Sequence, residues 1–550
     1  MLKIGILLRD FDKLENFELR IIKKIFNDED LTLSLVIMDG RNNNSNTRSF
    51  KSKFSRLIRS KNIIGIVLYN IQYYIEKKIF GQKFTVDKTE IKKLLNKTET
   101  IYLKPKRMGF LDVFNSSDSQ IIEDYKLDII LRHDFNIIRG PILKSSKYGI
   151  WSFHHGDNSI NRGGPPGFWE IVLNQSNIGV TLQQLTPELD GGLVIDKCFS
   201  NKTFSHFKNE TRIYEDSVSL LFKNINKLKN QKYTFNKSKT YFNILYKTPS
   251  VKYSLIYIYK FYSYIFKKIF ERIDSKIFST RYNCWSLFIG KGDFMESSLF
   301  KLNPIKPPKN EFWADPFMIE EAGSIYVFFE NYSYITKKGK ISCGKIIDNK
   351  ITDITDVLEL DYHLSYPYIF RENGEIFMMP ETNENRQLEI YKCVSFPHRW
   401  EIYSTGFKGE IISDSHFYND DENQKWLFLN KRTESTKSDL ELYIYKIDSL
   451  KLGVVESHKQ NPVIINSKTA RNGGSIFKYN NQLIRPSQYN ADGIYGRGLN
   501  LNKILKLTIE DYEEECLIRV LPNFHKGLIG IHHLNQIDDL FVIDGCFNKL

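Results

Sequence analysis

The second half of the chain repeats a short pattern, and the length of the repeat constrains its fold. In each repeat, a polar or glycine-containing marker precedes a run of aromatic and apolar residues. The markers at Asp315, Tyr366, Asp414, Gly473 and His532 are spaced by 51, 48, 59 and 59 residues. Repeats of this length, each holding a few short strands, are typical of propeller blades. The sequence therefore predicts an all-β five-bladed propeller over residues 284–550.

The leading positions of the repeats are expected to surround a central funnel in which a polar ligand binds. The candidate residues are Asp315, Tyr366, Glu381, Asp414, His416, Arg485 and His532. Sugar binding, glycoside hydrolysis and a purely structural role all remain open for this funnel. Hydrolysis needs two carboxylates flanking the scissile bond, and Asp315 with Asp414 or Glu381 could supply them. Tyr366, however, stands where a hydrolase usually places an acid.

The first half of the chain alternates strands and helices. Residues 3–8 and 31–38 have the composition of buried strands, and residues 17–26 between them repeat apolar side chains at helical spacing. This order predicts an α/β domain with a Rossmann-like parallel sheet over residues 1–228. The G-x-G-x-x-G fingerprint is absent, which disfavours a nicotinamide-binding domain. Open α/β sheets bind ligands at the carboxyl ends of their strands, so we expect a site there.

The stretch Tyr148–Asp196 concentrates the candidate chemistry of this half. A short apolar run ends on His154 and His155, and a loop rich in Gly and Pro follows from Arg162 to Gly167. In such a loop the backbone can approach a ligand closely. Asp190 lies near the end of the stretch, and a histidine with a carboxylate can transfer protons. The same pair could equally belong to a hydrogen-bonded core network.

This pattern resembles the formyltransferase family, which includes methionyl-tRNA, glycinamide-ribonucleotide and sugar-nucleotide N-formyltransferases. Its members carry Asn-x-His-Pro-Ser, an Arg-Gly-x-x-Pro loop, a helix, Gly-x-Thr and Leu-Asp-x-Gly in that order. The resemblance assigns the catalytic histidine to His154 and the acid to Asp190. Two departures stand out: Ser152 replaces the catalytic asparagine, and His155-Gly156-Asp157 replaces the Pro-Ser run.

The resemblance implies transfer of a formyl group from N10-formyltetrahydrofolate to an amino sugar or nucleotide-linked amino sugar in surface-polysaccharide biosynthesis. His154 would stabilise the oxyanion, and Asp190 would orient or charge His154 and help to take the amine proton. Ser152 would donate to the oxyanion through a hydroxyl that is shorter than the asparagine amide of the family. A water or His155 would then complete the oxyanion hole. The residues expected along the substrate and cofactor loops are His155, Asp157, Arg162, Gly163, Met108, Gly109 and Phe110. No metal ligand is expected.

The second half resembles the propeller-like N-terminal region of plant glucosamine inositolphosphorylceramide transferases. Its Trp313-Ala-Asp-Pro-Phe run also resembles the first blade of furanosidase-type glycoside hydrolases. The plant region is not a glycosyltransferase domain, so the resemblance implies recognition of a glycan or glycolipid. One alternative function therefore stays open: a carbohydrate-recognition or glycan-processing propeller with a weakly active or inactive formyltransferase-like domain. Folate binding separates the two hypotheses, because only the first requires it.

Residues 229–283 form an aromatic and basic linker between the two halves. Within it, Tyr253–Ile273 is not apolar enough to span a bilayer. The segment could lie on an anionic membrane surface with Lys260, Lys267 and Lys268 turned to the headgroups, or pack between the domains with its aromatic rings buried. The formal net charge of +13 suits anionic partners without identifying one.

Cysteine usage and the first residues bear on the cellular compartment. The six cysteines are scattered without a C-x-x-C pair, which indicates reduced thiols. The first ten residues become charged too early for a signal peptide. We therefore expect a cytoplasmic protein, with peripheral contact at the inner face of the membrane as an open alternative. No nucleic-acid partner is expected, because the second half lacks the small barrel of the tRNA-specific subfamily.

Overall fold

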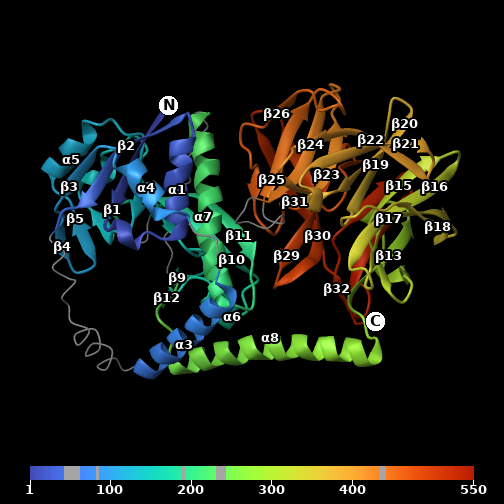
Figure 1. Ribbon diagram of the computed structural model, residues 1–550, viewed down its shortest axis with the longest axis horizontal. Coiled ribbons are helices and arrows are strands. Elements are labelled where there is room, and N and C mark those ends of the chain that lie inside the picture. The colour runs from blue at the N-terminus through green and yellow to red at the C-terminus, as the bar shows by residue number, and fades with distance from the viewer. Residues whose placement is uncertain (42–61, 82–85, 189–191, 231–242, 433–440, 550) are drawn as a thin grey trace. The chain divides into compact units, whose positions relative to one another are not determined.

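The computed structural model describes residues 1–41, 62–81, 86–188, 192–230, 243–432 and 441–549 (Figure 1). The chain divides into two compact units. The first comprises Met1–Cys198 with Lys202–Ser263, and the second comprises Phe199–Asn201 with Tyr264–Leu550. The division therefore falls inside the predicted linker.

A seven-stranded sheet forms the centre of the first unit, in the order β11-β10-β8-β6-β1-β2-β3. Its strands are β1 (Leu2–Leu8), β2 (Leu31–Asp39), β3 (Thr100–Leu103), β6 (Ile129–His133), β8 (Ile150–His154), β10 (Asn177–Gln184) and β11 (Leu193–Asn201). Strands β3, β2, β1, β6 and β8 pair in parallel, and β10 runs antiparallel to β8. The continuous apolar run of β1 suits a strand covered on both faces. The predicted α/β fold with a mainly parallel sheet is confirmed.

Helices and one small sheet surround this central sheet. The helices are α1 (Asn16–Asn27), α3 (Ile63–Phe80), α4 (Lys88–Leu95), α5 (Ser116–Glu123), α6 (Trp169–Val172) and α7 (His206–Lys229). Helices α1 and α7 lie side by side (Figure 1), and α1 begins with a capping box between Glu15 and Glu18. The small sheet is built from β4 (Lys106–Met108), β5 (Leu111–Val113) and β7 (Ile137–Arg139).

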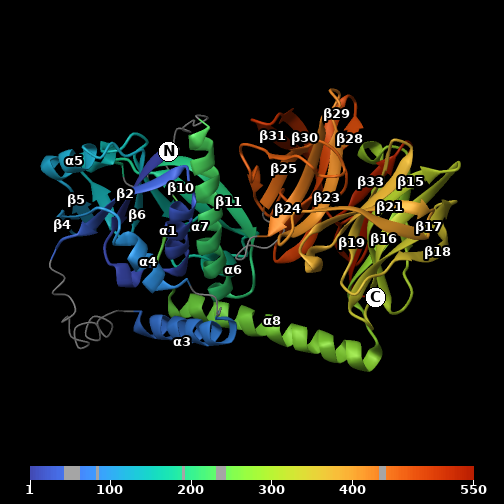
Figure 2. The same ribbon diagram turned by 45° about the horizontal axis from the view of Figure 1, so that its top comes forward.

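Helix α8 (Val251–Phe278) occupies most of the predicted linker. Its first turns pack beside α3 in the first unit (Figure 2), where the Ser254 hydroxyl donates to the carbonyl oxygen of Gly65 at 3.1 Å. Tyr257 and Phe261 are buried there, whereas most apolar side chains further along the helix are exposed. The Lys260 ammonium donates to the carbonyl oxygens of Ile171 and Val172 at 2.9 Å, so it does not turn to headgroups. No helix in the described part of the chain is long and apolar enough to cross a membrane.

The second unit contains five antiparallel sheets. Four are successive meanders: β15 (Glu311–Glu321) to β18 (Lys350–Leu358), β19 (Ser365–Glu372) to β22 (Arg399–Gly406), β23 (Ile411–Asn419) to β26 (Val455–Ser457), and β28 (Phe477–Tyr479) to β31 (Tyr512–Val520). In the fifth sheet, β13 (Tyr282–Lys291) from the start of the unit pairs with β34 (Leu540–Lys549) from its end. The predicted all-β region is confirmed. The described residues do not establish a closed propeller, so that part stays a prediction.

Three of the repeat markers are bulges in the first strand of a sheet. Asp315, Tyr366 and Asp414 each follow a register shift and have φ values of 52°, 45° and 47°. A left-handed backbone at a residue other than glycine is strained and persists only where its surroundings hold it. Here a carboxylate of another sheet accepts each N–H: Asp544 for Asp315 at 3.2 Å, Asp315 for Tyr366 at 3.3 Å and Glu381 for Asp414 at 3.3 Å. The repeat therefore encodes links between sheets.

Candidate functional sites

The first candidate site lies at the carboxyl end of β8. His154 is the last residue of this strand and pairs with Thr181 of β10. Its Nε2 lies 2.9 Å from the carbonyl oxygen of Asn161, which fixes the orientation of the ring. The Thr181 hydroxyl donates to the carbonyl oxygen of Gly156 at 2.9 Å. The histidine motif and the Gly-Val-Thr element are thus adjacent in the sheet.

Ser152 precedes His154 by two residues on β8. Side chains two residues apart in a strand lie on the same face of the sheet, so both belong to one face. Ser152 is buried, and its hydroxyl lies 3.5 Å from the carbonyl oxygen of Phe153, which is a weak hydrogen bond at most. The hydroxyl can therefore turn to a stronger acceptor at low cost.

His155 belongs to the aromatic core. Its ring lies against Phe17 of α1, Phe153 and Tyr214 of α7, with ring centroids 5.5, 5.8 and 4.7 Å away. Burial among these rings lowers the pKa of His155 to about 3, so the imidazole is neutral at pH 7. The role of His155 in an oxyanion hole stays a prediction, because a neutral imidazole can still donate through its one N–H. Its ring packs among aromatic side chains and carries no positive charge.

Asp157 anchors the loop that follows β8. It accepts hydrogen bonds from the Lys197 ammonium at 2.7 Å and the Ser159 hydroxyl at 2.6 Å. Burial acts against ionisation, but these donors hold the pKa of Asp157 below its ordinary value. The backbone N–H of Asn161 also donates to the carbonyl oxygen of Asp157 at 2.8 Å. Asp157 is thus an ionised loop anchor that supports the residue bonded to His154.

The glycine-rich loop packs against the chain itself. Residues Arg162–Gly163 (β9) pair in parallel with Leu245–Tyr246 (β12). A Cβ atom on Gly163 would lie 2.1 Å from the carbonyl oxygen of Tyr246, and one on Gly167 would lie 2.7 Å from the Cβ of Asn209. The guanidinium of Arg162 donates to the carbonyl oxygen of Asn243 at 3.4 Å. These two glycines serve close packing of the protein, rather than the ligand approach that the sequence suggested.

Two further predicted elements are the turn at Gly109 and the acid Asp190. Met108 and Phe110 flank a tight turn between β4 and β5, at which Gly109 has a φ of 62°, and both apolar side chains are exposed. Asp190 lies outside the described residues, so its relation to His154 stays a prediction.

Sequence reasoning missed a charged network beside this turn. Arg41, just after β2, forms ion pairs with Asp39 and with the buried Asp112 of β5, the latter at 2.7 Å. Asn136 donates to the second oxygen of Asp112 at 2.9 Å. The network ties the small sheet to the end of β2. Only the position of Asp39-Gly40-Arg41 after a strand could have signalled it.

The second candidate site is an acidic pocket of about 360 Å³ in the second unit. Carboxylates, two cationic groups and aromatic rings line it: Trp285, Phe312, Ala314, Asp315, Glu330, Tyr332, His363, Ser365, Glu381, Arg471, Tyr495 and His532. Three of the predicted funnel residues, Asp315, Glu381 and His532, meet here. Polar groups that fix orientation beside aromatic walls are typical of small-molecule sites.

Buried acids dominate the electrostatics of this pocket. Burial, together with the nearby Asp414 and Asp544, raises the pKa of Asp315 to about 7 against the opposing effect of His532. Burial also raises the pKa of Glu330 and of Glu381 well above their ordinary range. At neutral pH these groups can therefore hold protons and donate hydrogen bonds.

Each cation in the pocket pairs with acids and lies against an aromatic ring. Arg471 binds Asp414 through Nε and through Nη2, the latter at 3.2 Å, and packs 5.0 Å from the ring centroid of Tyr495. Its Nη2 also lies 3.5 Å from Glu381. The Nδ1 atom of His532 lies 2.6 Å from a carboxylate oxygen of Asp544. The ring of His532 stacks on the ring of Trp285, with 3.9 Å between the ring centroids.

His532 and its acids also form the one cluster in the described residues that could hold a metal ion. One ligand atom each from Asp315, His532 and Asp544 lies within 4.8 Å of the others. Although burial opposes it, Asp544 raises the pKa of His532, and His532 in turn holds the pKa of Asp544 low. The pair is therefore ionic. A metal ligand must be a neutral imidazole, so metal binding would have to displace this proton.

The other predicted funnel residues lie behind the pocket or in the core. Tyr366 is fully buried, and its hydroxyl accepts from the N–H of Gly474 at 3.2 Å. Asp414 stands behind Arg471. His416 stacks on Phe428, and burial lowers its pKa to about 3. Arg485 is fully buried against Glu514 at 2.6 Å. His416 and Arg485 do not line this pocket, because their partners belong to the core and to an outer strand.

Among the residues that sequence reasoning missed are Trp285, Arg471 and Tyr495 in the pocket, and Asp544, which pairs with His532. Arg471 lies two residues before Gly473, the fourth repeat marker, a position that the repeat could have indicated. No comparable signal marks Trp285 or Tyr495.

Comparison with known proteins finds one family over part of the second unit. The family model described as glucosamine inositolphosphorylceramide transferase 1, N-terminal, matches residues 303–532. The curated protein glucosamine inositolphosphorylceramide transferase 1 from Oryza sativa subsp. japonica is 36% identical over 212 residues, covering 38% of this chain and 28% of its own length. The protein of the same name from Arabidopsis thaliana is 36% identical over 212 residues, covering 38% and 27%. The chain thus spans little more than a quarter of these relatives.

Solved structures show weaker similarity. Glycinamide ribonucleotide transformylase 1 from Symbiobacterium toebii has a TM-score of 0.28 at 13% identity, covering 42% of this chain and 89% of its own. A 4-N formyltransferase from Francisella tularensis has a TM-score of 0.28 at 17% sequence identity, and the match covers 46% of this chain and 87% of that protein. A thermostable family-43 glycoside hydrolase has a TM-score of 0.33 at 10% sequence identity, and the match covers 43% of this chain and 88% of that protein. These scores are too low to establish a shared fold.

Proposed function

We propose that the first unit is an N-formyltransferase that uses N10-formyltetrahydrofolate and acts on the amine of an amino sugar or nucleotide-linked amino sugar. The main support is the position of His154 at the carboxyl end of β8, next to Thr181 and followed by the Arg162–Gly167 loop. The elements that resemble the formyltransferase motifs are therefore neighbours at the edge where α/β sheets bind ligands.

The exposed turn at Gly109 fits the proposed donor. Met108 and Phe110 offer apolar side chains on either side of this turn, which suits the flat pterin ring of a folate. When bound, the folate supplies an activated formyl carbon. The turn would hold the ring, and the β8 edge would hold the acceptor amine.

In this mechanism the formyl group would pass from N10 of the bound folate to the acceptor amine, and N10 would gain a proton as the amine loses one. Negative charge would develop on the formyl oxygen during the transfer. His154, oriented by the Asn161 carbonyl, would donate to the oxyanion. The buried Ser152 hydroxyl, on the same strand face, would be a second donor. Asp190 would assist the proton transfer from the amine.

The experiment that tests this function is direct. Full-length protein is incubated with N10-formyltetrahydrofolate and a panel of nucleotide-linked amino sugars, and products are followed by mass spectrometry. We expect one formylated acceptor, with no product from His154→Gln and normal product from His398→Gln, a matched change at an exposed histidine. Absence of formylated product with every acceptor, from folded protein that also fails to bind folate, would contradict the proposal.

For the second unit, we propose that the five sheets are propeller blades and that the acidic pocket binds a glycan or glycolipid. The pairing of β13 with β34 and the carboxylate links between sheets support closure of the ring. Carboxylates beside Trp285 and Tyr495 suit sugar hydroxyls and the apolar face of a sugar ring. Calorimetry with the amino-sugar series tests this site, and Asp315→Asn or Asp414→Asn should weaken the measured binding.

One observation favours a second candidate function for this pocket. A carboxyl with a pKa of about 7, such as Asp315, can act as the general acid of glycoside cleavage. In that case the protein is a glycan-processing propeller, and the first unit is weakly active or inactive. Release of reducing sugar from a glycan panel, lost in Asp315→Asn, would favour this function.

A further inference from the structure

The second half of α8 exposes an apolar stripe. In the portion that belongs to the second unit, Phe266, Phe270, Ile273 and Ile277 are 50% to 66% exposed. Their spacing of four, three and four residues aligns them on one side of the helix. Single exposed apolar residues are ordinary, but a contiguous stripe of large side chains marks a surface that contacts something apolar.

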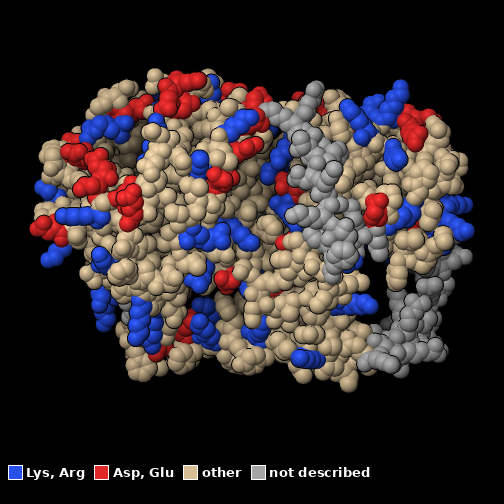
Figure 3. All heavy atoms as spheres, turned by 180° about the vertical axis from the view of Figure 1, so that it is seen from behind, with Lys and Arg blue, Asp and Glu red and all other residues tan. Residues whose placement is uncertain are grey.

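Positive charge borders this stripe. Lys267, Arg272 and Lys276 are exposed on the same half-helix. Its two acids, Glu271 and Asp274, are buried, and the exposed Lys267 lies 3.7 Å from Glu271. Figure 3 shows several Lys and Arg side chains in blue near the lower edge of this face, with a few Asp and Glu in red among them.

The two buried acids are already neutralised within the second unit. The Lys268 ammonium donates to Glu271 at 2.7 Å, so Lys268 does not turn to headgroups as its sequence position had suggested. The Tyr282 hydroxyl and the Lys549 ammonium donate to Asp274 at 2.6 and 3.2 Å. The exposed face is therefore basic and apolar.

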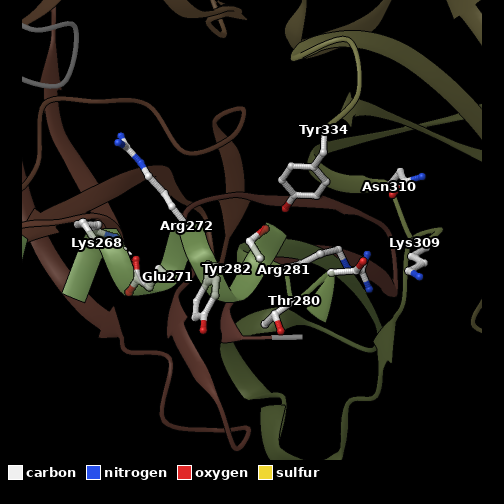
Figure 4. Close-up of a pocket in the computed structure, with 11 residues that line it drawn as sticks. Lys268, Glu271, Arg272, Thr280, Arg281, Tyr282, Lys309, Asn310 and Tyr334 are labelled. Carbon is white, nitrogen blue, oxygen red and sulfur yellow. Dashed lines mark hydrogen bonds and ion pairs between the residues drawn. The ribbon is translucent and has the colours of Figure 1, made fainter. Parts of the chain in front are cut away.

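A basic pocket of about 530 Å³ lies beside the last turns of the helix (Figure 4). Four cations, one acid and several hydroxyl groups line it: Lys268, Arg272, Arg281, Lys309, Glu271, Ser275, Ser279, Thr280, Tyr282, Asn310 and Tyr334. The Arg281 guanidinium is held in place by donating to the carbonyl oxygen of Pro308 at 2.9 Å. Since Lys268 neutralises Glu271, the pocket keeps an excess of cationic donors, which suits phosphate oxygens.

We propose that this half of α8 docks on an anionic lipid bilayer and that the basic pocket receives a phosphorylated headgroup. The apolar stripe enters the upper acyl region, and Lys267, Arg272 and Lys276 lie among the headgroups with their stems along the apolar layer. A second copy of the chain fits this face less well, because two apposed stripes would bring their rows of cations together. The inference is independent of the formyl-transfer proposal.

The test is co-sedimentation of full-length protein with vesicles. Three compositions are compared: phosphatidylcholine alone, phosphatidylcholine with phosphatidylserine, and phosphatidylcholine with phosphatidylinositol 4-phosphate. We expect at least tenfold tighter binding to both anionic compositions than to phosphatidylcholine, and weaker binding at high salt. Soluble inositol phosphate should displace part of the protein from the phosphoinositide vesicles only.

Variants separate the stripe from the pocket. The triple change Phe266→Ser, Phe270→Ser, Ile273→Ser should reduce binding to background. The matched control changes Phe300, Ile335 and Ile402 to Ser, which are 59% to 73% exposed elsewhere in the second unit, and should bind normally. Arg272→Gln with Lys309→Gln should lower binding to the phosphoinositide vesicles most.

A Phe270→Trp variant provides a readout that does not depend on a disruptive change. Its additional fluorescence should be quenched by lipids brominated on their acyl chains. Absence of quenching, equal binding by the stripe and control variants, or no vesicle binding by folded wild type would each overturn the proposal. A wild-type dimer that the stripe variant converts to a monomer would instead show that a second copy covers this face.

Discussion

The two candidate sites are assembled in opposite ways. The β8 edge takes its groups from one short stretch, with Ser152 and His154 on one strand and Asn161 in the next loop. The acidic pocket collects Asp315, Glu381, Arg471 and His532 from different sheets far apart in sequence. The first site can therefore be recognised from a local motif, and the second only through the repeat that aligns its sheets.

The two sites also differ in what their residues contribute to stability. Around His154 the hydrogen-bond partner is a backbone carbonyl, so a change there should alter the reaction more than the fold. In the pocket, buried ionised groups depend on one another, because an unpaired buried charge is costly. Mutations at the first site should therefore change the rate of the reaction. Mutations in the pocket of the second unit should change stability and ligand binding together.

The largest expected effect is that of Arg471→Gln. This change leaves the buried Asp414 without the cation it pairs with. We expect the second unit to lose about 3–5 kcal/mol of stability, as when one partner of a buried pair is removed, and to lose sugar binding. Denaturant unfolding measures the loss of stability, and calorimetry measures the loss of sugar binding. Lys478→Gln, which removes an exposed ion pair, is the control and should leave the stability of the second unit close to that of wild type. Equal stability losses in the two variants would show that the pocket charges are not coupled.

His154→Ala should have the next largest effect, on rate alone. Losing an oxyanion donor lowers kcat by roughly 10²–10³-fold in known sites. Unfolding of both units should stay within about 0.5 kcal/mol of wild type, as for a change away from structural features. Single-turnover kinetics with the identified acceptor measures the rate. A wild-type rate in this variant would remove His154 from the mechanism.

The local parts of both units could be predicted from sequence. The apolar run of β1 and the crossover pattern gave the parallel sheet, and the repeat gave five all-β segments. The aromatic packing of His155 could not be predicted, because the rings around it, Phe17 and Tyr214, come from distant helices. Gly163 and Gly167 likewise looked like ligand-binding glycines until Tyr246 and Asn209 were found against them.

The same limit applies to the second unit. Arg485 and His416 occupy polar positions near repeat markers, yet Glu514 and Phe428 hold them away from the pocket. Those contacts depend on register between strands, which the sequence pattern does not specify. Arg471 lies two residues before the Gly473 marker, but a single arginine beside an Asn-Gly-Gly turn does not by itself indicate a ligand site.

Ser152→Ala should have a smaller effect than His154→Ala. A neutral hydroxyl contributes about 0.5–1.5 kcal/mol as a hydrogen-bond donor, so we expect kcat to fall several-fold with little change in KM. Ser152→Asn, which restores the residue of the resembled family, should be tolerated or faster. Steady-state kinetics on both variants checks this. A folded but inactive Ser152→Asn would show that the β8 edge has been rebuilt around the smaller side chain.

A further expected effect is the pH dependence that Asp315 gives to the second unit. Its pKa of about 7 in the folded state lies above the ordinary value of 3.8, so the folded state binds more protons between these values. Stability from this group is therefore present at low pH and declines as pH rises from about 4 to about 7. In Asp315→Asn this decline should be shallower. The loss of stability below about pH 4 that comes from Asp544, whose pKa is lowered, should remain. Thermal unfolding of full-length protein at a series of pH values measures both slopes, at about 2–4 °C per kcal/mol.

The first unit is the internal control, because its transition should not respond to Asp315→Asn. A second-unit transition with the wild-type slope in this variant would mean that Glu330 and Glu381 carry the pH dependence, because burial raises their pKa values in the same direction.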